Sequence, residues 1–225
     1  MNPHNAETTG RKPAPRWRRR KDTRPAEILA AAQEIFGERG YDATRLEDVG
    51  RRAGCTKGTV FLYYESKSEL FKAAVREAMS PMVRDTEQAV EEHQGSAKDL
   101  LTKVLRLRWE HMERARLTGL VKLLLTETGK YPDLARFYND EFFDRGQALL
   151  RKVIQKGVDS GEFRKVDVEQ AARVVVSPLF FAAVWRHTFE PVASTPIELS
   201  TYFKTGLDVM LTGLDPAHID EPLRT

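Results

Sequence analysis

The chain of 225 residues has a single cysteine, Cys55, and no long uninterrupted hydrophobic run. One cysteine excludes an intramolecular disulfide and a cysteine-rich zinc module, and it favours a reducing compartment. The longest apolar stretch, around Val174–Trp185, is interrupted by Ser177 and Pro178 and is expected to be too short to span a bilayer. We therefore expect a cytoplasmic protein that does not associate with membranes.

Sequence motifs of catalysis and metal binding are also missing. No two histidines lie four residues apart, and the HExxH, G-x-S-x-G, P-loop and dinucleotide-binding patterns do not occur. The histidines are His4, His93, His111, His187 and His218. These absences argue against a small helical enzyme or a metal-binding bundle, so no catalytic residue, cofactor or metal is expected.

The formal net charge of +3 conceals an uneven distribution of charge. Residues 1–24 contain eight basic and two acidic residues, a net charge of +6, whereas residues 25–75 contain seven basic and eight acidic ones, a net charge of −1. Residues 1–23 also contain three prolines and no apolar periodicity, so they are expected to have little fixed structure. A solvated tail and an arm that follows DNA phosphates both fit this composition.

After this arm, the spacing of apolar residues predicts a helix that begins near Pro25 and ends at Gly40. The segment Thr44-Arg45-Leu46-Glu47 has the pattern of a capping box and predicts a second, short helix that Thr44 caps. A hydroxyl cap at Thr56 predicts a third helix through about Tyr63. A second capping box at 66–69 predicts a fourth helix. Two short helices joined by a glycine-containing turn form a helix-turn-helix.

On the third predicted helix, Val60 and Tyr64 share the face that is expected to pack inward. Lys57 and Phe61 would then face outward, where an ammonium group and an aromatic ring suit contacts with DNA phosphates and base edges. The alternative is that Phe61, Leu62 and Tyr63 complete the core, because a short helix that is apolar on all sides is usually buried.

The run of residues 49–70 closely resembles the DNA-binding domain of the tetracycline-repressor (TetR) family, and the resemblance covers residues 24–75. The residues that carry it are Val49-Gly50-Arg51-Arg52-Ala53-Gly54-Cys55-Thr56-Lys57-Gly58-Thr59-Val60-Phe61-Leu62-Tyr63-Tyr64-Glu65-Ser66-Lys67-Ser68-Glu69-Leu70. The resemblance implies an all-helical homodimer whose third helix enters the major groove. The positions that it assigns to DNA contact are Thr44, Arg45, Thr56, Lys57, Gly58, Thr59, Phe61, Leu62, Tyr63 and Lys67.

Three positions depart from the family pattern. Phe61 stands where the family usually has tyrosine, so ring packing replaces a hydroxyl–phosphate bond there. Gly50 replaces the usual alanine, which is expected to cost helix stability by roughly 1 kcal/mol unless close packing requires glycine. Cys55 occupies a turn position where the family favours valine or isoleucine. A buried apolar role fits Cys55, and a redox-sensing thiol is the alternative.

The remainder, residues 76–225, is predicted to be a helical regulatory domain for ligand binding and dimerisation. Apolar periodicity predicts helices over residues 97–114, 117–128, 132–157, 168–189 and 196–211. Residues 137–178 resemble the regulatory domain of AcrR-like members of the family, which implies an enclosed pocket for a small apolar or aromatic effector. The expected pocket residues are Trp109, His111, Met112, Leu124, Phe137, Tyr138, Phe142, Phe143, Phe181 and Trp185. The alternative is that these side chains are ordinary core residues.

The resemblance implies that the last two long helices form the dimer interface. Small residues on the first of them allow close approach, and aromatic residues supply bulk. The expected interface residues are Ala172, Val175, Leu179, Ala182, Tyr202 and Phe203.

Together these features predict a homodimeric, sequence-specific transcriptional regulator, most simply a repressor that its effector releases from a palindromic operator. An adaptor that uses an apolar helical face to bind another protein is the alternative.

Overall fold

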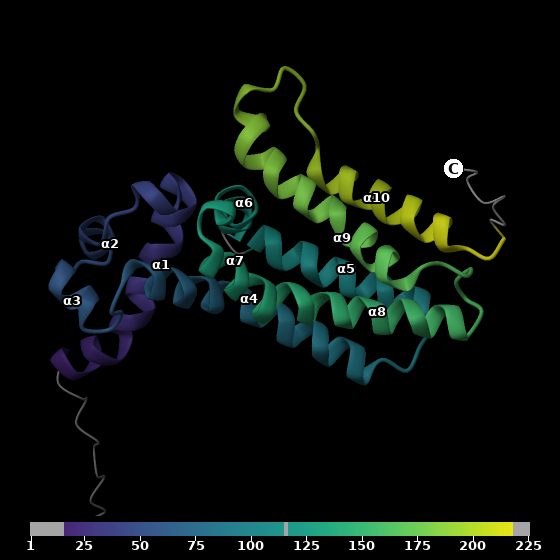
Figure 1. Ribbon diagram of the computed structural model, residues 1–225, viewed down its shortest axis with the longest axis horizontal. Coiled ribbons are helices and arrows are strands. Elements are labelled where there is room, and N and C mark those ends of the chain that lie inside the picture. The colour runs from purple at the N-terminus through teal and green to yellow at the C-terminus, as the bar shows by residue number, and fades with distance from the viewer. Residues whose placement is uncertain (1–15, 115–116, 218–225) are drawn as a thin grey trace, which may run out of the picture.

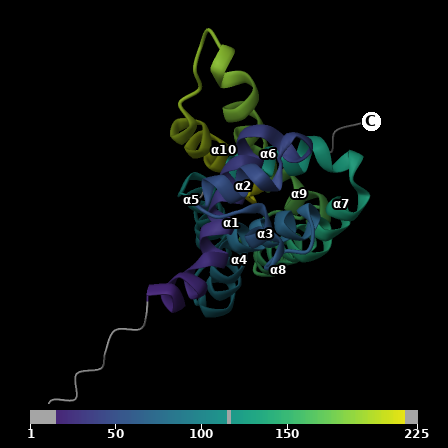
Figure 2. The ribbon, with the colours of Figure 1, turned by 90° about the vertical axis from the view of Figure 1, so that its left-hand side faces the viewer.

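The computed structural model describes residues 16–114 and 117–217, and all the regular elements of these residues are helical (Figure 1). Three helices form one end of the molecule, and the long helix α4 leads from them into the body (Figures 1 and 2). These first four elements are α1 (Arg16–Ala43), α2 (Leu46–Arg52), α3 (Lys57–Phe61) and α4 (Lys67–Glu92).

The body is built from antiparallel and crossing helices that surround a hydrophobic core of their own. Its α-helices are α5 (Ala97–Arg114), α6 (Leu117–Glu127), α7 (Pro132–Tyr138), α8 (Asp144–Asp159), α9 (Val168–Val184) and α10 (Leu199–Leu214). Short 3₁₀ segments lie at Thr128–Lys130 and Glu190–Val192, and π-helical turns lie at Asn139–Phe143 and Trp185–Phe189.

The beginning of α1 differs from the prediction. The helix begins at Arg16, so the predicted unstructured arm is helical from this residue to its end at residue 23, and Pro25 lies inside the helix instead of in its first turn. Residues 16–24 are mostly arginine and lysine, whose helix propensity is high even without an apolar stripe. Residues 1–15 lie outside the described residues. The predicted break at Gly40 is confirmed by a left-handed φ of 79°.

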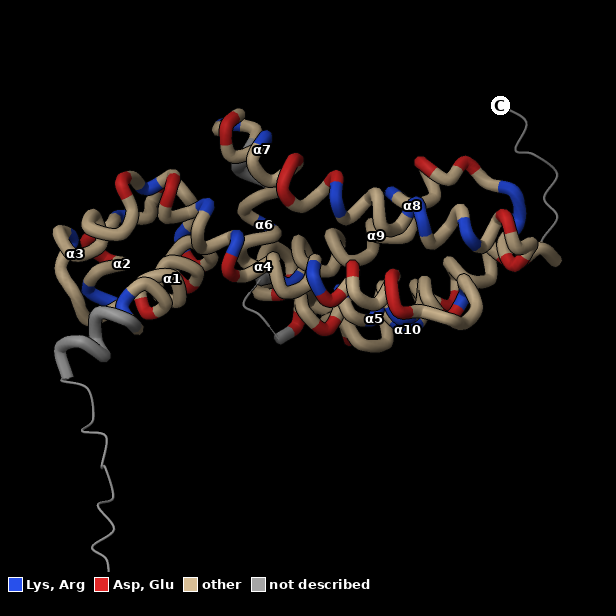
Figure 3. The backbone as a smooth tube through the Cα atoms, turned by 90° about the horizontal axis from the view of Figure 1, so that it is seen from below, with Lys and Arg blue, Asp and Glu red and all other residues tan. Residues whose placement is uncertain are grey.

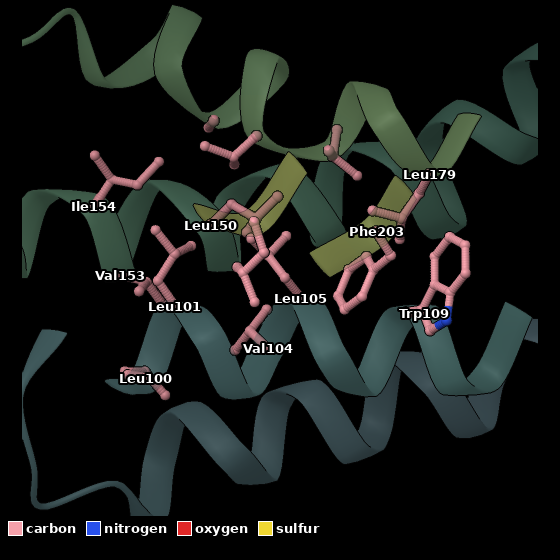
Figure 4. Close-up of a cluster of buried hydrophobic side chains, with 14 of the residues drawn as sticks. Leu100, Leu101, Val104, Leu105, Trp109, Leu150, Val153, Ile154, Leu179 and Phe203 are labelled. Atoms are coloured by element: carbon pink, nitrogen blue, oxygen red, sulfur yellow. The ribbon is translucent and has the colours of Figure 1, made fainter. Parts of the chain in front are cut away.

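Two hydrophobic clusters stabilise the molecule. The first joins α1–α4 to α6 and α7, so the three-helix end shares its core with part of the body. The second lies between α5, α8, α9 and α10, where Figure 4 shows Trp109 and Phe203 beside one another among aliphatic side chains. Their rings stack with centroids 4.7 Å apart. Burial of apolar surface on this scale is the main favourable term in folding.

Helices α1 and α6 approach each other through two glycines. A Cβ atom built on Gly119 would lie 3.0 Å from the Cα atom of Gly37 and 3.3 Å from its carbonyl oxygen. Side chains at this crossing would therefore push the two helices apart. Through this contact, the backbone of the three-helix end packs directly against the backbone of the body.

The predicted helix over residues 132–157 is interrupted by the π-helical turn Asn139–Phe143, which separates α7 from α8. The helix predicted over residues 168–189 is longer than expected. The expectation that the apolar stretch in this region is too short to span a bilayer is wrong, because Val168–Val192 forms a helical stretch that is long and apolar enough by length and composition alone. Within the fold α9 packs against α8, α6 and α10, so much of its apolar surface serves the core.

Gly157 is expected to be essential for packing of the second core. A Cβ atom at this position would lie 2.1 Å from a ring carbon of the buried Phe163. We expect Gly157→Ala to lower the free energy of unfolding by about 1–3 kcal/mol through overpacking. Chemical denaturation of the wild type and the variant would measure this loss in the free energy of unfolding. Gly213→Ala is the control, because its Cβ meets nothing within 4 Å and alanine favours a helix; an equal loss in both variants would contradict this reason.

Candidate functional site

The turn between α2 and α3 is short and tightly packed. The Thr56 hydroxyl accepts a hydrogen bond from the Thr59 backbone N–H at 3.2 Å and caps α3, as predicted. The Cys55 N–H donates to the Gly50 carbonyl oxygen at 2.8 Å. A Cβ atom on Gly50 would lie 3.0 Å from the Cys55 carbonyl oxygen. Close packing therefore accounts for glycine in the middle of α2.

Helix α3 presents an apolar and basic surface to solvent. Val60 is fully buried and anchors the inner side, whereas Phe61 is 43% exposed and Leu62 is 83% exposed. The Lys57 ammonium lies 5.7 Å from the centre of the Phe61 ring and forms an ion pair with Glu47 at 2.6 Å. The outward face predicted for Phe61 is confirmed, and the alternative in which Phe61 and Leu62 complete the core is wrong.

The other predicted contact residues on and around α3 differ in exposure. Gly58 and Arg45 are exposed, and the Thr59 hydroxyl lies 3.0 Å from the Thr56 hydroxyl. Tyr63 is half-buried and packs against the first cluster. Lys57, Gly58 and Phe61 are thus the exposed residues of α3, and Leu62, just after its end, is exposed as well. Figure 3 shows both basic and acidic positions around this end of the molecule.

Thr44 does not cap α2, contrary to the prediction, and Lys67 is held at the end of α1. Thr44 is buried, and its hydroxyl donates to the Gly40 carbonyl oxygen at 2.7 Å, so it closes the end of α1 and does not cap α2. The Lys67 ammonium donates to the carbonyl oxygens of Tyr41 at 2.9 Å, Asp42 at 3.2 Å and Thr44 at 3.3 Å. Lys67 thus binds the carboxyl end of α1, where a cation is favourable.

Cys55 is half-buried against the first cluster. Burial raises the pKa of its thiol, although Arg24 partly opposes this shift. A raised pKa disfavours the thiolate, which is the reactive form. These observations favour the packing role of Cys55 over the redox-sensing alternative.

A cavity lies in the body between α4, α5, α6, α8, α9 and the π-helical turn. Its free volume is about 70 Å³, smaller than the roughly 300–1,000 Å³ of a typical ligand site. Three methionines contribute to its wall, and their flexible side chains can rearrange around a ligand. The lining residues are Met79, Met82, Val83, Arg108, Met112, Val121, Tyr138, Phe142, Phe143, Gly146, Gln147, Val176, Leu179 and Phe180.

Four of the predicted pocket residues line this cavity, and the rest do not. Met112, Tyr138, Phe142 and Phe143 are in its wall. The others are used elsewhere: Trp109 stacks on Phe203, His111 pairs with Asp85, Leu124 and Phe137 belong to the first cluster, and Phe181 stacks on Trp185. Sequence reasoning selected mostly aromatic residues and missed Met79, Met82, Arg108 and Gln147, because no spacing rule marks a cavity wall.

Arg108 is the charged residue of this wall. Its side chain is buried, Nη2 donates to the Gly146 carbonyl oxygen at 3.0 Å, and Nε has no hydrogen-bond partner. Burial lowers its pKa to about 10, and burial raises the pKa of Tyr138 to about 12. At neutral pH the arginine is therefore charged and the tyrosine neutral.

Most of the residues that were predicted to form the dimer interface lie in the core of the single chain instead. Ala172, Val175, Leu179, Ala182 and Phe203 are buried within a single chain, and Tyr202 is half-buried. The small residues pack α9 against its own neighbours. The opposite face of α9 and α10 is exposed instead and carries Val174, Phe181 and Val209, with exposed fractions of 61%, 44% and 63%.

Comparison with known proteins agrees with a helix-turn-helix end that is joined to a helical body. Residues 28–74 match the family described as bacterial regulatory proteins, tetR family, and residues 91–199 match the tetracyclin repressor-like C-terminal domain. The HTH-type transcriptional regulator YfiR of Bacillus subtilis is 30% identical over 152 residues, which cover 65% of this chain and 71% of that protein. The repressor KstR2 of Rhodococcus jostii is 26% identical and covers 88% of this chain and 94% of its own.

Solved structures show the same fold. The transcriptional regulator FadR from Bacillus subtilis, solved in complex with stearoyl-CoA, has a TM-score of 0.71 at 21% identity over 84% of this chain and 98% of its own. The helix-turn-helix end of this chain thus matches the N-terminal domain of one family, and its helical body matches the C-terminal domain of the same family. The chain belongs to the TetR family of bacterial DNA-binding transcriptional regulators.

Proposed function

We propose that the protein is a homodimeric repressor that binds a palindromic operator through α3 and is released by a small apolar effector. The observation that carries this proposal is the surface of α3, where Phe61 and Leu62 are exposed beside Lys57 while Val60 holds the helix to the core. Exposure of apolar side chains to water is unfavourable, whereas in a major groove the same side chains can pack against thymine methyl groups and sugars.

A dimer would place two copies of α3 in successive major grooves, about 34–36 Å apart. The exposed apolar face of α9 and α10 supports such a dimer, because Val174, Phe181 and Val209 form a surface that a monomer would leave in water. A two-fold axis through this face would pair the same residues of both protomers. The operator would then be palindromic.

The cavity is well placed to influence α3 through two helices. Helix α4 contributes Met79 and Met82 to the wall, and its first residue, Lys67, holds the end of α1. Helix α6 contributes Val121, two residues after the Gly119 contact with α1. A ligand that enlarges the cavity would move these helices. It could change the equilibrium between the DNA-binding and the released conformation by no more than its difference in affinity for the two.

A third link joins the π-helical turn to α4. Glu141 of the turn accepts two hydrogen bonds from Arg76 of α4, at 2.7 Å and 2.6 Å, while Phe142 and Phe143 of the same turn line the cavity. The Arg76 guanidinium also lies 4.8 Å from the centre of the Phe137 ring. Movement of the turn on ligand binding would therefore reach α4 directly.

Relatives support an apolar effector. One related protein is named a fatty acid metabolism regulator, and FadR was solved with stearoyl-CoA. The apolar wall of the cavity is consistent with a ligand of this kind.

The proposal is tested by footprinting on DNA upstream of the protein's own gene, followed by gel shifts with apolar and aromatic compounds. We expect a protected palindrome, binding by a dimer, and release by at least one compound that raises the melting temperature. Equal affinity for operator and random DNA would overturn the proposal and favour the adaptor alternative.

A further inference from the structure

The cavity contains a buried cation whose hydrogen bonds are incomplete. The Arg108 side chain is 7% exposed. One of its nitrogens, Nη2, donates to the Gly146 carbonyl oxygen, and another, Nε, has no partner. A buried donor without a partner is unfavourable, and it is more unfavourable on a charged group.

The glycine beside Arg108 makes room for the guanidinium. A Cβ atom on Gly146 would lie 3.0 Å from Nη2 and 3.3 Å from Nη1 of Arg108. The guanidinium therefore packs directly on the backbone of α8. Its position is defined by this contact and by the hydrogen bond to the same residue.

No counter-ion for Arg108 is found among the residues whose side chains the structure describes. None of the ion pairs between side chains of these residues involves Arg108, and the charged state of the nearby Tyr138 is disfavoured by a pKa raised to about 12. A pKa of about 10 keeps Arg108 itself charged at neutral pH. An unpaired buried charge is compensated when an anion binds beside it.

The rest of the wall restricts what this anion can be. The lining is mostly apolar and includes Met79, Met112 and Phe142. Gln147 is the exception: its Oε1 atom is buried without a partner, and rotation of the amide would present two N–H donors to an acceptor. The wall thus combines a hydrocarbon surface with donors at one place.

We propose that Arg108 is the anchor of an effector carboxylate, and that the effector is an apolar molecule ending in a free carboxylate, such as a medium-chain fatty acid. This inference rests on the proposed effector pocket. The proposal predicts a difference between the free acid and a neutral ester or alcohol of the same chain, because only the acid supplies a negative charge to pair with Arg108.

Isothermal calorimetry and thermal shift with decanoic acid, methyl decanoate and decanol test the proposal on the full chain. We expect the acid to bind the wild-type protein about 10- to 100-fold more tightly than the ester or the alcohol, as expected for hydrogen bonds to a charged group. Equal affinities of acid, ester and alcohol for the wild type would overturn it, and this comparison needs no variant.

Arg108→Met removes the charge and keeps an apolar side chain of similar length. We expect this variant to lose the preference for the acid, while the control Arg106→Met, at an exposed position of the same helix, retains it. Retention of the preference in a folded Arg108→Met variant would overturn the proposal. If that variant does not fold, Gly146→Ala, which displaces the guanidinium, is expected to weaken acid binding selectively.

Gel shifts separate this inference from the proposed function. If decanoic acid binds with the expected preference but leaves the operator complex intact, the anchor stands and ligand release fails. If an effector without a carboxylate releases the operator and the acid does not bind, the proposed function stands and the anchor fails.

Discussion

Lys57→Ala is expected to weaken operator binding by about 1–3 kcal/mol, roughly 10- to 100-fold, if the ammonium contacts a base edge. The exposed position of Lys57 beside the Phe61 ring is the reason for this expectation. Titrations of operator and random DNA by fluorescence anisotropy would measure it. An equal loss on both DNAs would assign Lys57 to phosphate contact, and no loss on the operator would contradict its role at the interface.

Glu47→Gln provides the matched comparison. In the free protein Glu47 holds the Lys57 ammonium at 2.6 Å, and this hydrogen bond lowers the pKa of the Glu47 carboxyl group. Binding of DNA through Lys57 would have to break this pair. Removing the carboxylate is therefore expected to tighten DNA binding, and the gain should be absent when Lys57 is alanine.

Val174→Glu is expected to prevent dimerisation and thereby to abolish operator binding. A two-fold axis near this exposed position of α9 would bring two carboxylates together, and like charges in an interface cost several kcal/mol. We expect the dissociation constant of the dimer to rise by more than about 100-fold. Analytical ultracentrifugation would measure the constant, and circular dichroism would show that the helical content is retained.

Lys103→Gln is the control for Val174→Glu, because it changes the net charge equally at an exposed position on α5. This variant is expected to stay dimeric and to bind the operator like the wild type. If Val174→Glu remained dimeric, the exposed face of α9 and α10 would not be the interface, and the proposed arrangement of two α3 helices would fail with it.

Local signals in the sequence predicted the caps and breaks of the N-terminal helices well. Thr56 and Ser66 accept the predicted backbone hydrogen bonds, and Gly40 ends the regular part of α1. These features depend on residues within one turn of each other, so they can be recognised in a sequence. The capping box at Thr44 failed because a competing local hydrogen bond, to the carbonyl oxygen of Gly40 four residues earlier, uses that hydroxyl instead.

The sites that depend on packing between distant helices were predicted poorly. Ala172, Val175 and Leu179 are small or apolar residues on a long helix, and the same pattern fits a core and an interface equally well. Only the position of α9 between α8, α6 and α10 decides which face is buried. The cavity likewise brings together Met79, Arg108 and Gln147 from three helices, and no local spacing relates them.

The amino-acid sequence thus determined the helical class, the helix-turn-helix and the outward face of α3, because helix periodicity and caps are local properties. The tertiary structure alone decided which face of α9 is free, where the cavity lies and that Arg108 is buried within it, with no counter-ion among the side chains that the structure describes. These properties depend on which helices meet. A charged residue that reads as solvent-exposed in the sequence becomes a candidate ligand anchor once its neighbours remove it from water.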